Sequence, residues 1–137
     1  MQFSIEPNNG IPIYEQVVRQ IKYAIAEGVL VPGQVIPSVR ELAKQVAINP
    51  NTVQRAYQAL QDEKIVEALR GRGMAVCQFA KQRCVSDRQS LVAQRMQDVI
   101  GEAVQSGLDP ERLRAIFEET LSNSLAQPHS LQSQEQS

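Results

Sequence analysis

The sequence of 137 residues predicts a mainly helical protein with one small β-hairpin, in the α+β class. Apolar residues recur at helical spacing along most of the chain, and helix-starting and helix-ending residues divide that pattern into short segments. One Gly- and Arg-rich loop joins two short β-prone runs. Aromatic residues make up only 4% of the chain and Trp is absent, so the core must be built mainly from Val, Ile, Leu and Ala.

The first helix is expected over residues 12–27. Pro12 suits the first turn of a helix, and Gly28 is a good terminator. The apolar residues between them fall on one stripe of a helix: Tyr14, Val17, Val18, Ile21 and Ile25. The proline-containing stretch that follows, residues 29–37, is expected to be a connector that is extended in places.

Two short helices are expected next, over residues 38–46 and 50–62. Ser38 and Glu41 have the spacing of a capping box, in which a serine precedes the helix and a glutamate follows three positions later. Only residues 47–49 separate the two helices. This layout is that of a helix-turn-helix, whose second helix enters the major groove of DNA.

The second of these helices, 50–62, divides into an apolar and a polar face. Asn49 is a suitable N-cap, and Pro50 at the first helical position loses no hydrogen bond. The core-facing residues are Val53, Ala56, Tyr57 and Leu60. The candidate DNA contacts on this helix are Asn51, Thr52, Gln54, Arg55 and Gln58. Asn and Gln side chains pair bidentately with adenine, and Arg binds guanine or a phosphate.

A β-hairpin is expected from strands at 65–68 and 74–77, joined by the loop 69–73. Such a wing can reach the phosphate backbone or a minor groove, and its glycines allow a close backbone approach. Two cations of the helix 38–46 are expected beside the same duplex. The candidate contacts outside the second helix are therefore Arg40, Lys44, Arg70, Gly71 and Arg72.

The segment 80–125 is expected to be helical, with a break where Gly107 ends one helix and Asp109 caps the next. Two isolated helices cannot bury their apolar stripes alone, so we expect a four-helix bundle formed with a second copy of the chain. The alternative is that they fold back on the winged domain. The candidate dimerisation residues are Leu91, Met96, Val99, Ile100, Leu113, Ile116, Phe117 and Leu121. Residues 126–137, rich in Gln and Ser and containing His129, are expected to form a disordered tail.

Charge and composition limit the function classes. The net charge of −1 argues against a nucleic-acid binder, and the predicted DNA-binding domain, 1–79, holds eight Lys or Arg against seven Asp or Glu. A DNA-binding role must therefore rest on where the cations lie. The chain shows no signal peptide and no apolar run long enough to span a bilayer, so a soluble cytoplasmic protein is expected. Its two cysteines, Cys77 and Cys84, lack metal-ligand spacing; a buried, inert role is the first reading and a redox switch the alternative.

Several of these motifs together resemble the GntR family of regulators, and the short C-terminal part resembles its YtrA-type subfamily. The runs that carry the resemblance are Pro12 to Gln16, Pro32-Gly33, Pro37 to Ala43, Asn49 to Val53, Arg55-Ala56-Tyr57, Leu60 and Arg70 to Gly73. Many relatives have Gly where this chain has Lys64, and Thr-Phe where it has Met74-Ala75.

The resemblance implies a winged helix-turn-helix dimer that represses transcription from a palindromic operator. By resemblance, Arg40, the first turn of the helix 50–62 and the wing glycine Gly71 contact DNA. An enzyme is the first rival, but the sequence has no phosphate loop, nucleophile elbow or metal cluster, and no cofactor is expected. A winged-helix protein-interaction module without DNA affinity is the second. A small-molecule effector stays open, as do the operator and the regulated genes.

Overall fold

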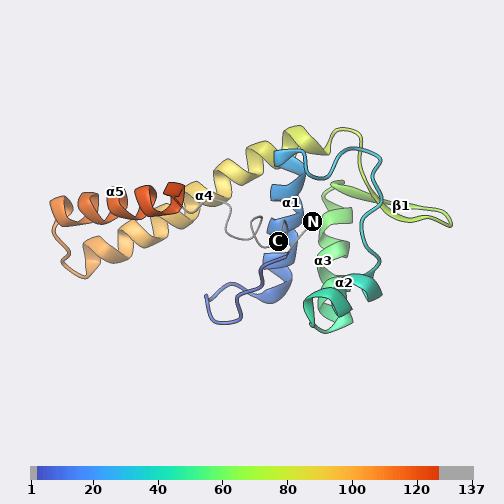
Figure 1. Cartoon of the computed structure of the whole chain (residues 1–137), viewed down its shortest axis with the longest axis horizontal. Coiled ribbons are helices and arrows are strands. Elements are labelled where there is room, and N and C mark those ends of the chain that lie inside the picture. The colour runs from blue at the N-terminus through green and yellow to red at the C-terminus, as the bar shows by residue number, and fades with distance from the viewer. Residues whose placement is uncertain (1–2, 127–137) are drawn as a thin grey trace. The chain divides into compact units, whose positions relative to one another are not determined.

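The computed structural model describes residues 3–126, which form five α-helices and one two-stranded hairpin. These residues divide into two compact units, with the boundary between Val92 and Ala93. Three helices and the hairpin belong to the first unit, and the fourth helix begins there (Figure 1). In chain order these elements are α1 (Ile13–Glu27), α2 (Val39–Val46), α3 (Pro50–Asp62), β1 (Val66–Leu69), β2 (Gly73–Val76) and α4 (Ala80–Gln105).

The core of the first unit lies between α1 and α3, with α2 packed on α3. The stripe expected on α1 is buried at Val17, Ile21 and Ile25, while Tyr14 and Val18 are partly buried at its margin. The whole apolar stripe of α3 is buried, as expected: Val53, Ala56, Tyr57 and Leu60. Aliphatic side chains from the three helices therefore exclude water together and set the direction of α3.

The hairpin is antiparallel, with Val66 opposite Val76 and Leu69 opposite Gly73. Each strand lies one residue from its predicted position: the first starts later, at Val66, and the second starts earlier, at Gly73. The loop is therefore three residues long rather than five. Ile65, expected to begin the first strand, is fully buried and its carbonyl accepts a hydrogen bond from the Cys77 backbone N–H at 2.9 Å.

The connector between α1 and α2 pairs with the outer edge of β2. The Gly33 N–H donates to the Val76 carbonyl at 2.8 Å, and the Val76 N–H donates to the Gln34 carbonyl at 2.9 Å. The Ile36 N–H donates to the Met74 carbonyl at 2.8 Å. These bonds satisfy the outer edge of β2 and support the base of the hairpin.

The fourth helix starts at Ala80, well before the first stripe residue expected there, Leu91. Cys84, for which a buried role was the first reading, is fully buried in α4 against the core of the first unit. The boundary expected between residues 79 and 80, which separates the DNA-binding domain from the dimerisation helices, remains a prediction. The compact units of the structure divide elsewhere, after Val92.

The second unit contains the end of α4 and α5 (Pro110–Ala126). Gly107 has a φ of 84°, a left-handed conformation that ends α4 as expected. The Asp109 carboxylate accepts a hydrogen bond from the Arg112 backbone N–H at 3.2 Å, which caps α5. The expected tail at 126–137 starts one residue too early, because Ala126 ends α5; the rest of it, with His129, lies outside the described residues. None of the described helices is long and apolar enough to cross a membrane.

Candidate nucleic-acid interface

The turn between α2 and α3 is built by two capping motifs. Ser38 and Glu41 form the expected capping box, since the Ser38 hydroxyl accepts from the Glu41 N–H at 3.1 Å and the Glu41 carboxylate accepts from the Ser38 N–H at 3.3 Å. Ala47 ends α2 in the left-handed conformation, with a φ of 55°. The Asn49 side chain then accepts from the Asn51 N–H at 2.8 Å and starts α3. The chain therefore changes direction within three residues, as a helix-turn-helix requires.

A hydrogen bond beneath α3 fixes it to the start of α2. The Tyr57 hydroxyl donates to the Pro37 backbone carbonyl at 2.6 Å. Burial, and to a smaller extent the nearby Glu41 carboxylate, raise the pKa of Tyr57, so the hydroxyl stays protonated and keeps donating. This bond joins the apolar side of α3 to the residue just before Ser38.

The opposite side of α3 is polar and exposed. Of the five residues expected there, Thr52 is half-buried, and Asn51, Gln54, Arg55 and Gln58 are exposed. The four exposed residues and Tyr14 of α1 line a shallow hollow of about 480 Å³. The Gln58 amide donates to the Asp62 carboxylate at 2.9 Å, and the Arg55 guanidinium lies 3.8 Å above the centre of the Tyr14 ring.

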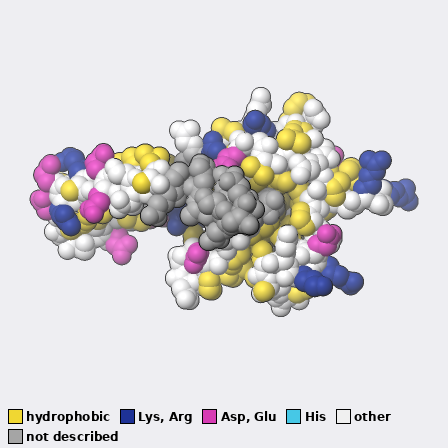
Figure 2. Space-filling view, viewed as in Figure 1, with side chains coloured by type: hydrophobic (Ala, Val, Ile, Leu, Met, Phe, Trp, Pro, Cys, Tyr) yellow, Lys and Arg dark blue, Asp and Glu magenta, His cyan; other side chains and the backbone are white. Residues whose placement is uncertain are grey.

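The hairpin loop presents two arginines at the end of a supported hairpin. Arg70, Gly71 and Arg72 are all exposed, and the Arg72 N–H donates to the Leu69 carbonyl at 2.9 Å to close the turn. Gly71 has a φ of 74°, a conformation that a side chain disfavours. Figure 2 shows Lys and Arg side chains gathered at the hairpin end and again beside α2, where Arg40 and Lys44 are exposed.

The five cations of the candidate interface have no acidic partner among residues 3–126. Across residues 3–126, the salt bridges of the structure involve other cations. The cations without such a bridge include Arg40, Lys44, Arg55, Arg70 and Arg72. Their guanidinium and ammonium groups therefore keep their donors available for an anionic partner, despite the net charge of −1.

Residues 13–76, which span the interface, match the model of the bacterial regulatory proteins, gntR family. The HTH-type transcriptional repressor YtrA of Bacillus subtilis is 38% identical over 115 residues, or 84% of this chain and 88% of that protein. The chain belongs to the gntR family. It is a DNA-binding transcription regulator with a winged helix-turn-helix, and its likeness to YtrA continues into the C-terminal helices.

Two solved structures from Listeria monocytogenes support this fold. One, described as a transcriptional antiterminator, has a TM-score of 0.64 at 29% identity and covers 88% of this chain and 90% of that chain. The other, a GntR family transcriptional regulator, has a TM-score of 0.63 at 30% identity and covers 82% of this chain and 97% of that chain. The expected fold class, a winged helix-turn-helix followed by two helices, is confirmed. The relatives named here are regulators of transcription, not enzymes.

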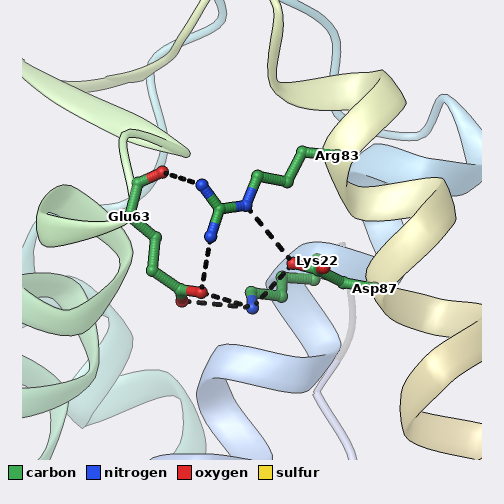
Figure 3. A network of polar contacts seen from close by, with 4 residues as sticks. All are labelled: Lys22, Glu63, Arg83 and Asp87. Atoms are coloured by element: carbon green, nitrogen blue, oxygen red, sulfur yellow. Dashed lines mark hydrogen bonds and ion pairs between the residues drawn. The ribbon is translucent and has the colours of Figure 1, made fainter.

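In this gntR-family chain an ionic cluster, which we call the α1–α3–α4 cluster, lies at the C-terminal end of α3 (Figure 3). The buried Lys22 ammonium of α1 lies 3.1 Å from a Glu63 carboxylate oxygen and 3.2 Å from one of Asp87. Arg83 of α4 donates to the Glu63 backbone carbonyl at 3.3 Å and lies 3.4 Å from its carboxylate. The cluster satisfies a carbonyl at the end of α3 and joins the first turns of α4 to the DNA-binding unit.

The sequence-based reasoning missed this cluster and the role of Tyr14 beneath Arg55. A lysine directly after the buried Ile21 was the available signal for the cluster, because a charged residue beside an apolar stripe needs a partner. Tyr14 was placed in the core stripe of α1; it lies at the edge of that stripe, half-buried, with one ring face towards Arg55.

The apolar residues expected to mediate dimerisation are largely exposed in the single chain. Ile116 is 37% exposed, Met96 40%, Leu121 43% and Phe117 47%, and no described residue of α5 is buried. Val99 and Ile100 are exposed as well, while Leu91 and Leu113 are half-buried. A soluble chain rarely leaves so many large apolar side chains in contact with water on one pair of helices.

Proposed function

We propose that the protein is a repressor that binds a palindromic operator as a homodimer and blocks access to the promoter. The observation that supports this most directly is the set of five exposed cations on α2, α3 and the hairpin loop, which have no acidic partner within the described part of the chain. The relative YtrA is named a transcriptional repressor.

In this proposal α3 enters the major groove. Asn51 and Gln54 lie on its exposed side and have the amide groups that pair with adenine. Arg55 binds a guanine edge or a phosphate, while Thr52 and Gln58 contact the backbone or bases nearby. The Tyr57 hydrogen bond to Pro37 supports this role, because it holds the helix from its buried side and leaves the polar side open.

Arg40, Lys44 and the wing bind the phosphate backbone. Arg40 follows the helix cap by two positions, at the start of α2, and Lys44 lies one turn further along. Arg70 and Arg72 flank Gly71, whose missing side chain permits close approach of the loop backbone to DNA. Contacts of this kind position the protein and bind all sequences alike.

The C-terminal helices supply the dimer interface, with DNA, a second copy of the chain and an unidentified small-molecule effector as partners in the cytoplasm. Their exposed apolar residues would be covered by the same surface of the partner in a four-helix bundle. A symmetric dimer places two copies of α3 on one face of the duplex, so half-site centres should be about one or a few helical turns apart.

Operator binding is tested with the full chain and a duplex that it selects from a random-sequence pool. Arg40→Ala and Arg55→Ala should each lower the affinity by about tenfold or more without unfolding the protein. Arg72→Ala should weaken binding to selected and scrambled duplexes equally, as a phosphate contact does. Arg112→Ala, on the exposed surface of α5, is the matched control and should bind like the parent. Parent-like binding by both Arg40→Ala and Arg55→Ala would refute these assignments.

The second candidate function is a winged-helix interaction module, which the net charge of −1 favours. Salt dependence separates the two candidates. A protein that neutralises several phosphates loses affinity for DNA steeply as salt rises, whereas a protein-interaction module selects no duplex at all. Analytical ultracentrifugation at micromolar concentration tests the dimer, and a monomer there would remove it.

A further inference from the structure

The aromatic ring of Tyr14 lies under a cation that the proposed function places at DNA. Tyr14 is in the first turn of α1, 41 positions before Arg55 in the sequence. The Arg55 guanidinium carbon lies 3.8 Å from the ring centroid, which is stacking distance. Arg55 is exposed whereas Tyr14 is half-buried, so the ring packs against the inner side of an arginine side chain that faces solvent.

Stacking on an aromatic ring leaves more of an arginine's N–H donors free than a salt bridge does. A carboxylate that holds an arginine occupies two of its five N–H donors, whereas an aromatic face binds the flat side of the guanidinium and leaves its rim open. The nearest acid on α1, Glu15, is engaged elsewhere: it lies 3.8 Å from Arg19 and accepts a hydrogen bond from the Tyr14 hydroxyl at 3.3 Å. Arg55 is thus held without losing its donors.

The neighbours of Arg55 on α3 strengthen this reasoning. Gln58, one turn further along, donates to Asp62 at 2.9 Å, so the acid that lines the same hollow has its own partner. The long Arg side chain would otherwise spread over many rotamers, and ordering it at the moment of binding costs free energy. A ring that holds it beforehand lowers that cost.

We propose that Tyr14 is a positioning residue, which pre-orders the Arg55 guanidinium for DNA through its ring face. The inference rests on the proposed function of Arg55 and extends the interface from α3 to α1. This positioning effect requires the aromatic ring of Tyr14 but not its hydroxyl, and it requires Arg55.

The experiment is a double-mutant cycle on the full chain with the duplex selected from a random pool. Tyr14→Phe keeps the ring and should bind within about twofold of the parent, whereas Tyr14→Leu should lose roughly three- to tenfold in affinity, the range of one cation–π contact. In an Arg55→Ala background, Tyr14→Leu should cause no further loss. Tyr23→Leu makes the same change at another half-buried tyrosine of α1 and is the control.

A loss from Tyr14→Leu that persists without Arg55, or no loss at all, would overturn the inference. If Arg55→Ala binds like the parent while Arg40→Ala does not, the role of Arg55 fails and operator binding stands. If the parent selects no duplex, the proposed function fails. The stacking of Arg55 on Tyr14 can be checked without DNA, by the ring-current shift of the Arg55 Nε–H resonance. This shift should be present in the parent and in Tyr14→Phe. If it were absent from both, the stacking geometry would be refuted even if Tyr14→Leu does not fold.

Discussion

Replacing Lys22 with methionine should destabilise the first unit by about 2 kcal/mol, because it removes the central cation of the α1–α3–α4 cluster. The side chain of Lys22 is only 8% exposed, and its ammonium lies 3.1 Å and 3.2 Å from two different carboxylates. Methionine keeps the apolar stem and leaves Glu63 and Asp87 with Arg83 as their nearby cation.

The magnitude follows from partial burial. At an effective dielectric constant of about 20, each of these contacts is worth about 5 kcal/mol of attraction before desolvation is subtracted. Breaking a fully buried pair costs about 3–5 kcal/mol. Because the two carboxylates are 34% and 29% exposed, water compensates part of that loss, which gives about 2 kcal/mol.

Urea and thermal unfolding followed by circular dichroism measure this change. For a unit of this size, about 2 kcal/mol lowers the midpoint of thermal unfolding by about 10 °C. Lys81→Met, at an exposed position of α4, is the control and should change stability by less than about 0.5 kcal/mol. In combination with Glu63→Gln, the effect of Lys22→Met should shrink. A change below about 0.5 kcal/mol, or full additivity with Glu63→Gln, would refute the reasoning.

Four further predictions concern stability and thiol chemistry. Lys64→Gly should stabilise the protein by about 0.5–1 kcal/mol in urea unfolding, because Lys64 has a φ of 62°; destabilisation would show that its side chain contributes more than this strain costs. Ser38→Ala should destabilise it by about 1 kcal/mol through loss of the α2 cap, and an unchanged unfolding midpoint would refute the role of that cap. Burial raises the pKa of the Cys84 thiol to about 11, so a maleimide at pH 8 should label Cys84 only after the protein unfolds. If Cys84 were labelled at the same rate in the native and the unfolded chain, its burial would be contradicted. The contribution of the raised pKa to the free energy of unfolding is fully present below about pH 9 and is lost as the pH rises through about 11. Between these pH values Cys84→Ala should therefore lose less stability than the parent protein.

Local signals in the sequence were sufficient to place the helices of the first unit. Caps at Ser38 and Asn49, and the terminator Gly28, act within a few residues of where they stand, so the ends of α1, α2 and α3 fall within one residue of their predicted positions. The polar side of α3 was predictable for the same reason, because its buried stripe has a strict helical period.

What the sequence did not reveal depends on contacts between distant segments. The strands lie one residue from their predicted positions because the connector before α2 pairs with β2, a contact that no local pattern indicates. Cys84 is in the core because α4 continues the first unit, and the ions of the α1–α3–α4 cluster come from positions up to 65 residues apart. Lys64 has a φ of 62°, a conformation that glycine adopts readily, so the glycine that the family resemblance implied at this position was a usable signal.

The attachment of α4 has a consequence for how the chain could be divided and recombined. A chimera that exchanged the C-terminal helices at residue 79 would separate Arg83 and Asp87 from Lys22 and Glu63, and would remove Cys84 from the core. A junction after Val92, where the compact unit ends, keeps all of these residues together. Exchange of the C-terminal helices among such regulators should therefore succeed at a junction inside α4, about three turns past the point where the helix begins.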